Sequence, residues 1–178
     1  MDALIPVDDA LARLLAGANC RVGTERIDVR KAGGRVAALG VSAAINVPPA
    51  DNSAMDGYAF AHEGVKEGQS LAVSARIPAG AAPRQLVPGT AARIFTGAPM
   101  PAGADTVVMQ EDTREEDGRV TITELPAPAD NVRPAGQDIA AGSEVIAAGR
   151  RLKAPDLGLA TSAGAAGIDV YTPLRVAL

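Results

Sequence analysis

Residues 48–60 read PPADNSAMDGYAF, and this stretch decides how the middle of the chain folds. The Pro48-Pro49 pair fixes φ and disfavours a helix immediately before the polar residues. Gly57 permits a sharp turn into Tyr58-Ala59-Phe60, whose composition favours a strand. The sequence therefore predicts a stiffly supported polar loop that leads directly into a strand.

This loop holds two carboxylates, an amide and a hydroxyl between Asp51 and Asp56. Such a concentration of polar groups indicates a binding or catalytic site. Asp and Asn before Gly are also ordinary turn residues, because they cap backbone donors and tolerate left-handed φ. The spacing alone leaves both interpretations open.

Composition limits the kind of protein. A chain of 178 residues suits one large domain or two small ones, with enough buried surface for a real core. The apolar 47% is mainly Ala, Val, Leu and Ile, because the chain has two Tyr, two Phe and no Trp. A net charge of −4 and scattered arginines argue against a nucleic-acid partner, which requires clustered basic residues. We expect a core of small aliphatic side chains.

Cys20 is the only cysteine and His62 the only histidine. These numbers exclude an intrachain disulfide, a thiolate zinc site and a His-rich metal site, so oxygen atoms would hold any metal. We interpret Cys20 as a small buried residue and His62 as a surface residue. The N-terminus lacks a secretory signal and residues 157–168 are too short to span a bilayer, so the sequence predicts a cytoplasmic protein without a membrane partner.

Helical spacing occurs near both ends of the chain. Pro6 to Ala16 has acidic residues near its positive end and leucines at helical spacing. Arg26 to Leu39 is predicted as a weaker helix, since Gly33-Gly34 in its middle costs about 1 kcal/mol per glycine relative to alanine. A further helix is predicted from Pro155 to about Ala165, because proline in the first turn favours a helix start.

From Val41 onward, short apolar runs separated by Pro and Gly indicate a compact β domain. The predicted strands are Val41–Ala44, Gly57–Phe60, Leu71–Ala75, Ala91–Phe95, Thr106–Met109, Arg119–Thr123 and Glu144–Ile146, with a hairpin turn at Asp117-Gly118. Leu174–Leu178 is apolar enough to open a parallel sheet, but no crossover helix follows it. We therefore expect the chain to be the N-terminal part of a longer protein.

Three segments, in the right order, resemble the MoeA/gephyrin family, the molybdopterin molybdotransferases. They are Pro48–Phe60, Arg93–Glu111 (RIFTGAPMPAGADTVVMQE) and Asn131–Ile139 (NVRPAGQDI). Three such loops with intervening strands are far more specific than a single glycine motif. The resemblance covers most of the chain from Arg35 to Leu178. It departs from the family's usual residues at Ala50, Gly33 and Ala135, which bear on packing more than on chemistry.

The resemblance implies an α+β fold, mostly β, in which a small β-barrel-like domain is inserted into an elongated α/β linker domain. The linker domain would comprise residues 1–50 and 139–172, and the β domain residues 51–138. Residues 173–178 would start a pterin-binding α/β domain absent from this chain. The activity implied for the full-length protein is the transfer of molybdate into adenylylated molybdopterin, with Mg²⁺ as cofactor and release of AMP.

In the family, the active site lies between the pterin-binding domain of one subunit and the β domain of its partner in a homodimer. The resemblance therefore implies that this chain supplies one wall and is inactive alone. The family's catalytic positions correspond to Asp56, Thr96 and Asp138, and we expect Ser53 and Gly97 to contact the cofactor substrate. Because bare carboxylates would repel a substrate with phosphate groups, Asp56 and Asp138 would need Mg²⁺ or pterin amino groups between them and the substrate, and we predict both as Mg²⁺ ligands.

Thr96, followed by Gly97, could offer its hydroxyl and nearby backbone N–H groups to an oxyanion. Structural alternatives remain: Asp138 as a turn cap, Thr96 as a strand-end hydroxyl, and Asp105 and Glu111 as solvated loop charges. Two alternative functions also remain, a scaffold or dimerisation module as in gephyrin, and a β domain that binds a small anion without catalysis.

Overall fold

The computed structural model describes residues 4–18, 22–82 and 84–176, and the chain divides into two compact units. The first unit is Met1–Val41, Ile146–Thr161 and Ala165–Leu178; the second unit is Ser42–Val145 and Ser162–Gly164. Most regular structure in the described residues is β, which confirms the predicted α+β, mostly β class. The finer domain limits, such as 51–138 for a β domain, stay predictions.

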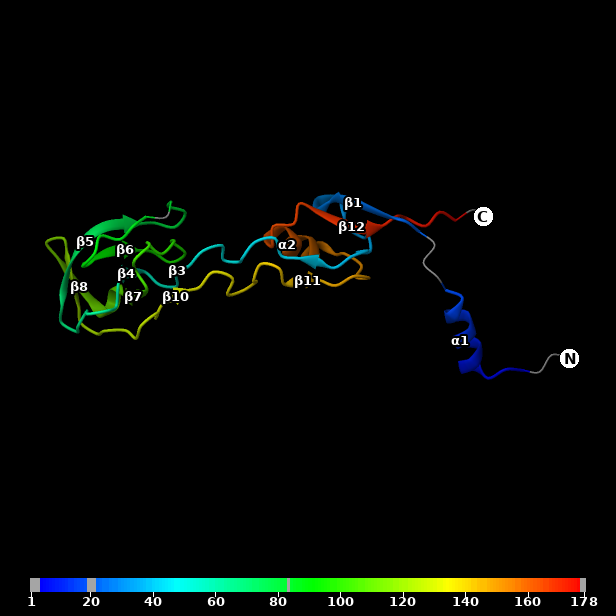
Figure 1. Cartoon of the computed structure of the whole chain (residues 1–178), viewed down its shortest axis with the longest axis horizontal. Helices are drawn as coiled ribbons and strands as arrows, with labels where there is room; N and C mark the ends of the chain where they lie inside the picture. Colours follow the sequence, from blue (N-terminus) through cyan, green and yellow to red (C-terminus); the bar gives the residue numbers. More distant parts are fainter. Residues whose placement is uncertain (1–3, 19–21, 83, 177–178) are drawn as a thin grey trace. The chain divides into compact units, whose positions relative to one another are not determined.

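The second unit is built on a six-stranded sheet with the strand order β7-β4-β6-β5-β9-β8 (Figure 1). Its strands are β4 (Gly57–Phe60), β5 (Ser70–Ile77), β6 (Thr90–Ile94), β7 (Thr106–Met109), β8 (Thr113–Glu116) and β9 (Arg119–Ile122). The β5–β6 pair is parallel and the other pairs in this sheet are antiparallel. The sheet curls into a half-barrel, so that the Tyr58 hydroxyl in β4 donates a hydrogen bond to Glu115 in β8.

Apolar side chains cover both faces of this sheet. One cluster consists of Tyr58, Phe60, Leu71, Ala91, Val108, Val120 and Ile122. The other consists of Ala59, Ile77, Leu86, Ala92, Ile94, Ala98 and Val107. Tyr58 and Phe60 belong to the first cluster and Ala59 to the second, because successive residues of a strand point to opposite faces. Every residue of β4 is buried, so β4 gives the residues directly before it a rigid support.

Two pairs of shorter strands accompany the six-stranded sheet. In the second unit, the two-residue strands β3 (Asn52–Ser53) and β10 (Val132–Arg133) pair with each other. Strand β2 (Val41–Ser42) pairs with β11 (Glu144–Ile146), and each of these two strands contains residues of both units. A turn of 3₁₀-helix, η2 (Gln110–Asp112), joins β7 to β8. The β3–β10 pair matters most for function, because β3 lies inside the loop that the sequence singles out.

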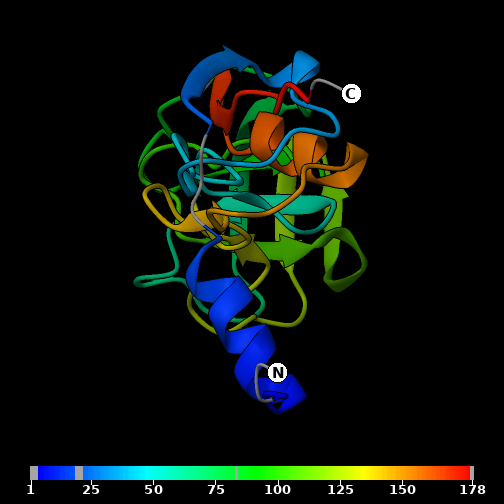
Figure 2. The ribbon, with the colours of Figure 1, turned by 90° about the vertical axis from the view of Figure 1, so that its right-hand side faces the viewer.

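The first unit contains β1 (Thr24–Asp28), which pairs antiparallel with β12 (Gly167–Tyr171). The 3₁₀-turn η1 (Val29–Lys31) follows β1, and α2 (Ala154–Ser162) lies beside the β1–β12 pair in two perpendicular views (Figure 1 and Figure 2). Helix α1 (Val7–Ala16) has no buried residue. Among the described residues, no helix combines the length and apolar character that crossing a bilayer requires.

The helix predicted at Arg26–Leu39 is wrong, because its first residues form β1 and η1 instead. Ile27 lies opposite Ile168 in the β1–β12 pair, and Gly34 has φ +79°, which an α-helix does not accept. The predicted strand at Leu174–Leu178 is also wrong for residues 174–176, which have no regular structure. Residues 177–178 and Cys20 lie outside the described residues.

The other predicted elements are confirmed, with small differences at their ends. Helices α1 and α2 correspond to the predictions near Pro6 and Pro155, and each predicted strand before Leu174 has a counterpart. Asp117-Gly118 forms the turn between β8 and β9, with positive φ at both residues. The sequence interpretation missed the strands β1, β3, β8, β10 and β12.

Candidate functional site

The three segments that carry the family resemblance meet in the second unit through main-chain hydrogen bonds. The Ser53 amide donates to the Ala98 carbonyl at 2.9 Å, and the Ser53 carbonyl accepts from the Gly97 amide at 2.8 Å. The Ala54 amide donates to the Asn131 carbonyl at 2.8 Å. Loops that are far apart in the sequence are therefore fixed beside one another by backbone groups, whatever side chains they carry.

Asp56 lies directly before β4, and its carboxylate is held by a single residue of another loop. The amide nitrogen and the hydroxyl of Thr96 both donate to Asp56 Oδ1, each at 2.8 Å. The hydrogen bond from the Thr96 amide is the largest cause of a pKa of Asp56 below its ordinary value. The hydrogen bond from the Thr96 hydroxyl and the positive charge of Arg93 lower this pKa further. Oδ2 accepts no hydrogen bond within the described residues. Asp56 is thus an ionised, oriented carboxylate with one oxygen still available.

Gly57 fixes where Asp56 stands, because β4 is packed closely between its neighbours. Gly57 lies opposite Ile94 in β6 and Met109 in β7. A Cβ at this position would lie 1.9 Å from the Val108 carbonyl oxygen, far inside contact distance. The φ of Gly57 is not positive, so close backbone approach, rather than the turn inferred from the sequence, requires glycine here.

Arg93 is a part of this site that the sequence interpretation did not single out. Its guanidinium donates to the Gly57 carbonyl at 2.8 Å and to Gln110 Oε1 at 2.6 Å. The same group lies 5.2 Å from the Tyr58 ring centroid and 4.6 Å from that of Phe95. The sequence signal that could have indicated Arg93 is its position as a charged residue between the apolar residues of a strand. Arg93 brings positive charge close to Asp56 and is itself firmly oriented.

Ser53 and Gly97, the predicted cofactor contacts, both have internal partners. The Ser53 side chain is buried, and its hydroxyl donates to the Met55 carbonyl at 2.6 Å. Gly97 has φ +78°, and its amide is taken by Ser53, just as the Thr96 amide is taken by Asp56. In this conformation both residues shape the loops. Their predicted contacts with a substrate stay predictions, and an anion would have to compete for these amides.

Asp138 has a different partner from Asp56 and Thr96. Both carboxylate oxygens accept from Arg133 Nη2, at 3.0 and 2.8 Å, and the two side chains form an exposed ion pair. No hydrogen bond joins Asp138 to the Asp56–Thr96 pair within the described residues. The structure therefore brings together two of the three predicted catalytic residues, and it gives the third a cationic partner.

The predicted Mg²⁺ ligands Asp56 and Asp138 do not form a metal site by themselves in the described part of the chain. Asp138 is neutralised by Arg133, and Asp56 offers one free oxygen. Mg²⁺ prefers octahedral oxygen coordination and usually takes one or two carboxylates together with substrate phosphates and water. Across the described residues, no group of three or more His, Cys, Asp or Glu side chains is placed to hold a metal ion.

Of two further polar side chains in the opening loop, one joins two loops and the other has no hydrogen-bond partner in the described structure. Asp51 Oδ1 accepts the Ala135 amide at 2.7 Å and so ties the first loop to the third. Asn52 Oδ1 is buried and has no hydrogen-bond partner in the described structure. An unsatisfied buried acceptor costs on the order of 1–3 kcal/mol, so Asn52 is a point where this junction could accept an additional donor.

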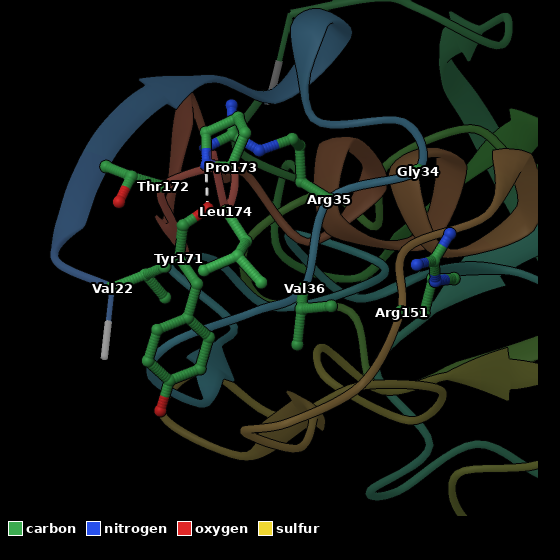
Figure 3. A pocket seen from close by; sticks show the side chains of 9 residues that line it. All are labelled: Val22, Gly34, Arg35, Val36, Arg151, Tyr171, Thr172, Pro173 and Leu174. Atoms are coloured by element: carbon green, nitrogen blue, oxygen red, sulfur yellow. Dashed lines mark hydrogen bonds between the residues drawn. The ribbon is translucent and has the colours of Figure 1, made fainter. Parts of the chain in front are cut away.

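A separate pocket of about 450 Å³ lies in the first unit (Figure 3). It is lined by Val22, Gly34, Arg35, Val36, Arg151, Tyr171, Thr172, Pro173 and Leu174. Arg35 is occupied there, since it donates to the Tyr171 carbonyl at 2.6 Å and pairs with Glu25. The lining contains none of the residues predicted to act in catalysis or binding. The Asp56–Thr96 pair with Arg93 is therefore the stronger candidate site.

The second unit is thus a small β domain whose curved sheet supports three loops, and these loops present an oriented carboxylate close to an arginine. The family described as "MoeA N-terminal region (domain I and II)" matches residues 5–164. The chain belongs to this family.

Two relatives show the extent of the similarity. A molybdopterin molybdenumtransferase of Nostoc sp. is 44% identical over 161 residues, which are 87% of this chain and 37% of that protein. A protein of the same name from Haemophilus influenzae is 37% identical over 175 residues, or 97% of this chain and 43% of that protein. This chain thus spans less than half the length of these relatives.

The fold is also found in solved structures. The crystal structure of the molybdopterin biosynthesis MoeA protein from Pyrococcus horikosii superposes with a TM-score of 0.86 at 30% sequence identity. The match covers 95% of this chain and 44% of that chain. Both the sequence and the fold therefore place the chain in the same family.

Proposed function

We propose that this chain supplies part of the active site of an enzyme that transfers molybdenum to molybdopterin in molybdenum cofactor biosynthesis. Its relatives carry the name molybdopterin molybdenumtransferase, and they share nearly the whole of this chain. The observation that carries the proposal is the bonding of Asp56, whose carboxylate is held by Thr96 through one oxygen only. A carboxylate fixed in this way is prepared to orient a substrate.

We assign Asp56 the role of accepting a donor group of the substrate through Oδ2. Its lowered pKa keeps it ionised at neutral pH, and two bonds to one residue prevent it from turning away. A pterin ring carries amino groups that can donate to such an oxygen. Thr96 acts through Asp56 as a positioning residue. We keep Asp138 as a second candidate, which would have to exchange its Arg133 partner to contact a substrate.

A homodimer belongs to this proposal, because the family resemblance implies an active site completed by a partner subunit. Helix α1 supports it, since Leu11, Leu14 and Leu15 are at least half exposed on a helix with no buried residue. Exposed apolar stripes of this kind mark interaction surfaces. A strictly monomeric chain in sedimentation at high concentration would remove this part of the proposal.

The catalytic role is tested by replacing Asp56 with Asn in a complete protein that carries this segment, and by measuring molybdenum incorporation into molybdopterin. Asn keeps an acceptor for Thr96 but removes the charge. We expect a loss of about 100-fold or more in the rate, the size found when one preorganised polar group is removed from an active site. Thr96→Val, which leaves the amide in place, should lose less.

Glu111→Gln is the matched control, because it removes a carboxylate from the segment that contains Thr96. Glu111 is exposed, and within the described residues its side chain accepts one hydrogen bond, from the neighbouring Gln110. This variant should keep the wild-type rate. An unchanged rate in Asp56→Asn, or an equal loss in both variants, contradicts the proposed role.

A further inference from the structure

Two arginines lie over one aromatic ring where the inner strands β5 and β6 end. The guanidinium carbons of Arg76 and Arg93 are 4.5 and 4.6 Å from the ring centroid of Phe95. The two arginines lie directly opposite each other where β5 pairs with β6. Phe95 follows β6 and immediately precedes Thr96. Both arginines therefore contact the residue directly before Thr96, whose amide and hydroxyl bind Asp56.

Like charges on paired residues of neighbouring strands repel each other. The ring of Phe95 offsets part of this repulsion, because guanidinium groups are attracted to an aromatic face. Neither Arg76 nor Arg93 forms an ion pair with a carboxylate of the described structure. Two positive charges are thus concentrated at one place without an opposite charge bound to them.

The two arginines differ in how much of their hydrogen-bonding capacity is used. Arg93 is half-buried and donates to Gly57, Ile94 and Gln110. Arg76 is exposed and stacks on Phe95, and its guanidinium forms no hydrogen bond or ion pair within the described residues. Since a guanidinium has five N–H donors, Arg76 holds an oriented set of donors toward solvent.

Two carboxylates near Arg93 accept hydrogen bonds from neutral donors. Glu115 accepts the hydroxyl of Tyr58, over whose ring Arg93 also lies. Burial and the bond to Glu115 raise the pKa of Tyr58 to about 12, so its hydroxyl remains a donor to Glu115 over the working pH range. Asp56 is held by Thr96. Neither acid forms an ion pair with Arg76 or Arg93 in the described structure.

We propose that Arg76 and Arg93, oriented by the ring of Phe95, form a binding site for a tetrahedral oxyanion. Guanidinium forks match the paired oxygens of such a group, and stacking reduces the entropy lost on binding. The anion is either a phosphate group of the substrate or a free oxyanion such as molybdate. The choice of these two sources rests on the proposed function, whereas the site itself rests on the arginine geometry.

The test is a titration of the isotope-labelled 178-residue chain, followed by amide-correlation NMR at constant ionic strength. Methyl phosphate and molybdate are added in separate series. We expect saturable shifts at Phe95 and Thr96 with at least one of them. Arg76→Gln should weaken this binding by roughly tenfold or more, the loss expected for a charge-assisted hydrogen bond. Binding of methyl phosphate alone identifies a substrate phosphate, and binding of molybdate alone identifies the free oxyanion.

Arg114→Gln is the matched control, because Arg114 is exposed in β8 and its side chain has no partner in the described structure. It should bind like the wild type. Phe95→Leu, a second variant, keeps both charges but removes the ring and should also weaken binding. Absence of saturation with both anions, or equal weakening in Arg76→Gln and Arg114→Gln, overturns the proposal. Because molybdenum incorporation is not measured, this outcome is separate from the result for Asp56.

Discussion

Asp56 in the second unit and Asp156 in the first unit are both carboxylates held by a backbone amide, but they differ in how their second oxygen is used. Each carboxylate accepts a backbone amide, of Thr96 for Asp56 and of Lys153 for Asp156. In each case this amide bond is the main cause of a pKa below the ordinary value. Asp156 has a second oxygen bonded to Arg150 at 2.8 Å, and it is buried.

The difference lies in the second oxygen and in the origin of the amide donor. Lys153 directly precedes α2, so Asp156 closes the helix N-terminus from the third helical position, as in half of a capping box. Both carboxylate oxygens of Asp156 therefore have partners inside the fold. Asp56 reaches across to a residue forty positions away and leaves Oδ2 unpaired. A lowered pKa therefore does not identify a functional carboxylate; an unused oxygen beside an oriented arginine is the better guide.

The largest effect should come from moving Asp56 without replacing it, through Gly57→Ala. The new methyl group would meet the backbone of Val108, so β4 and β7 must separate. We expect a loss of at least about 2 kcal/mol in the free energy of unfolding, measured by urea denaturation. Gly158→Ala, close to Asp156 in α2, is the control, since its Cβ would contact nothing. It should stabilise by up to about 1 kcal/mol, and equal losses in both variants would refute the close-approach argument.

An intermediate effect is expected from Asp156→Asn. The variant removes the charge that holds Arg150 and weakens the acceptor for Lys153. Because the folded pKa of Asp156 is lowered, its stabilisation is complete above the unfolded pKa of about 3.9 and is lost as the pH falls through the folded value. The unfolding free energy of the variant should therefore be lower than that of the wild type at neutral pH. The difference should shrink in acid, and a constant difference would show that the charge is not responsible.

The smallest effect on stability is expected from Asp56→Asn, the variant with the large expected effect on activity. Asn retains an oxygen that can accept from Thr96, and the position is not fully buried. Its melting temperature at neutral pH should lie close to that of the wild type in a thermal scan of both proteins. A drop larger than that of Asp156→Asn would reverse the comparison and make Asp56 a structural residue.

The sequence predicted best where one strand is enclosed by apolar neighbours. Gly57–Phe60 and Thr106–Met109 are largely apolar runs, and both strands are almost entirely buried. Thr113–Glu116 was missed because its side chains are polar and mostly exposed, although its backbone pairs regularly with β9. Arg26–Leu39 was misread because its strand partner lies some 140 positions later, at Gly167–Tyr171. The pattern of residues within one segment cannot reveal a strand partner so far away in the sequence.

The candidate site shows the same limit. Asp56 and Thr96 were both predicted, each from its own segment, but the bond between them depends on the β4–β6 register. Asp138 was predicted as a partner of Asp56, whereas Arg133, only five positions away, holds both its oxygens. The role of Arg93 follows from its position opposite Tyr58, which is a property of strand pairing and not of spacing.

The pairing of β1 with β12 also sets an order in which the chain can fold. Residues 24–28 meet residues 167–171, so this contact closes a loop that contains the whole second unit. Closing so long a loop is slow, because its entropy is lost before any contact is gained. During synthesis the half-barrel sheet can fold as soon as β9 has emerged, while β1 must wait for β12. The unit that carries Asp56 is therefore expected to fold first, with the first unit completed last.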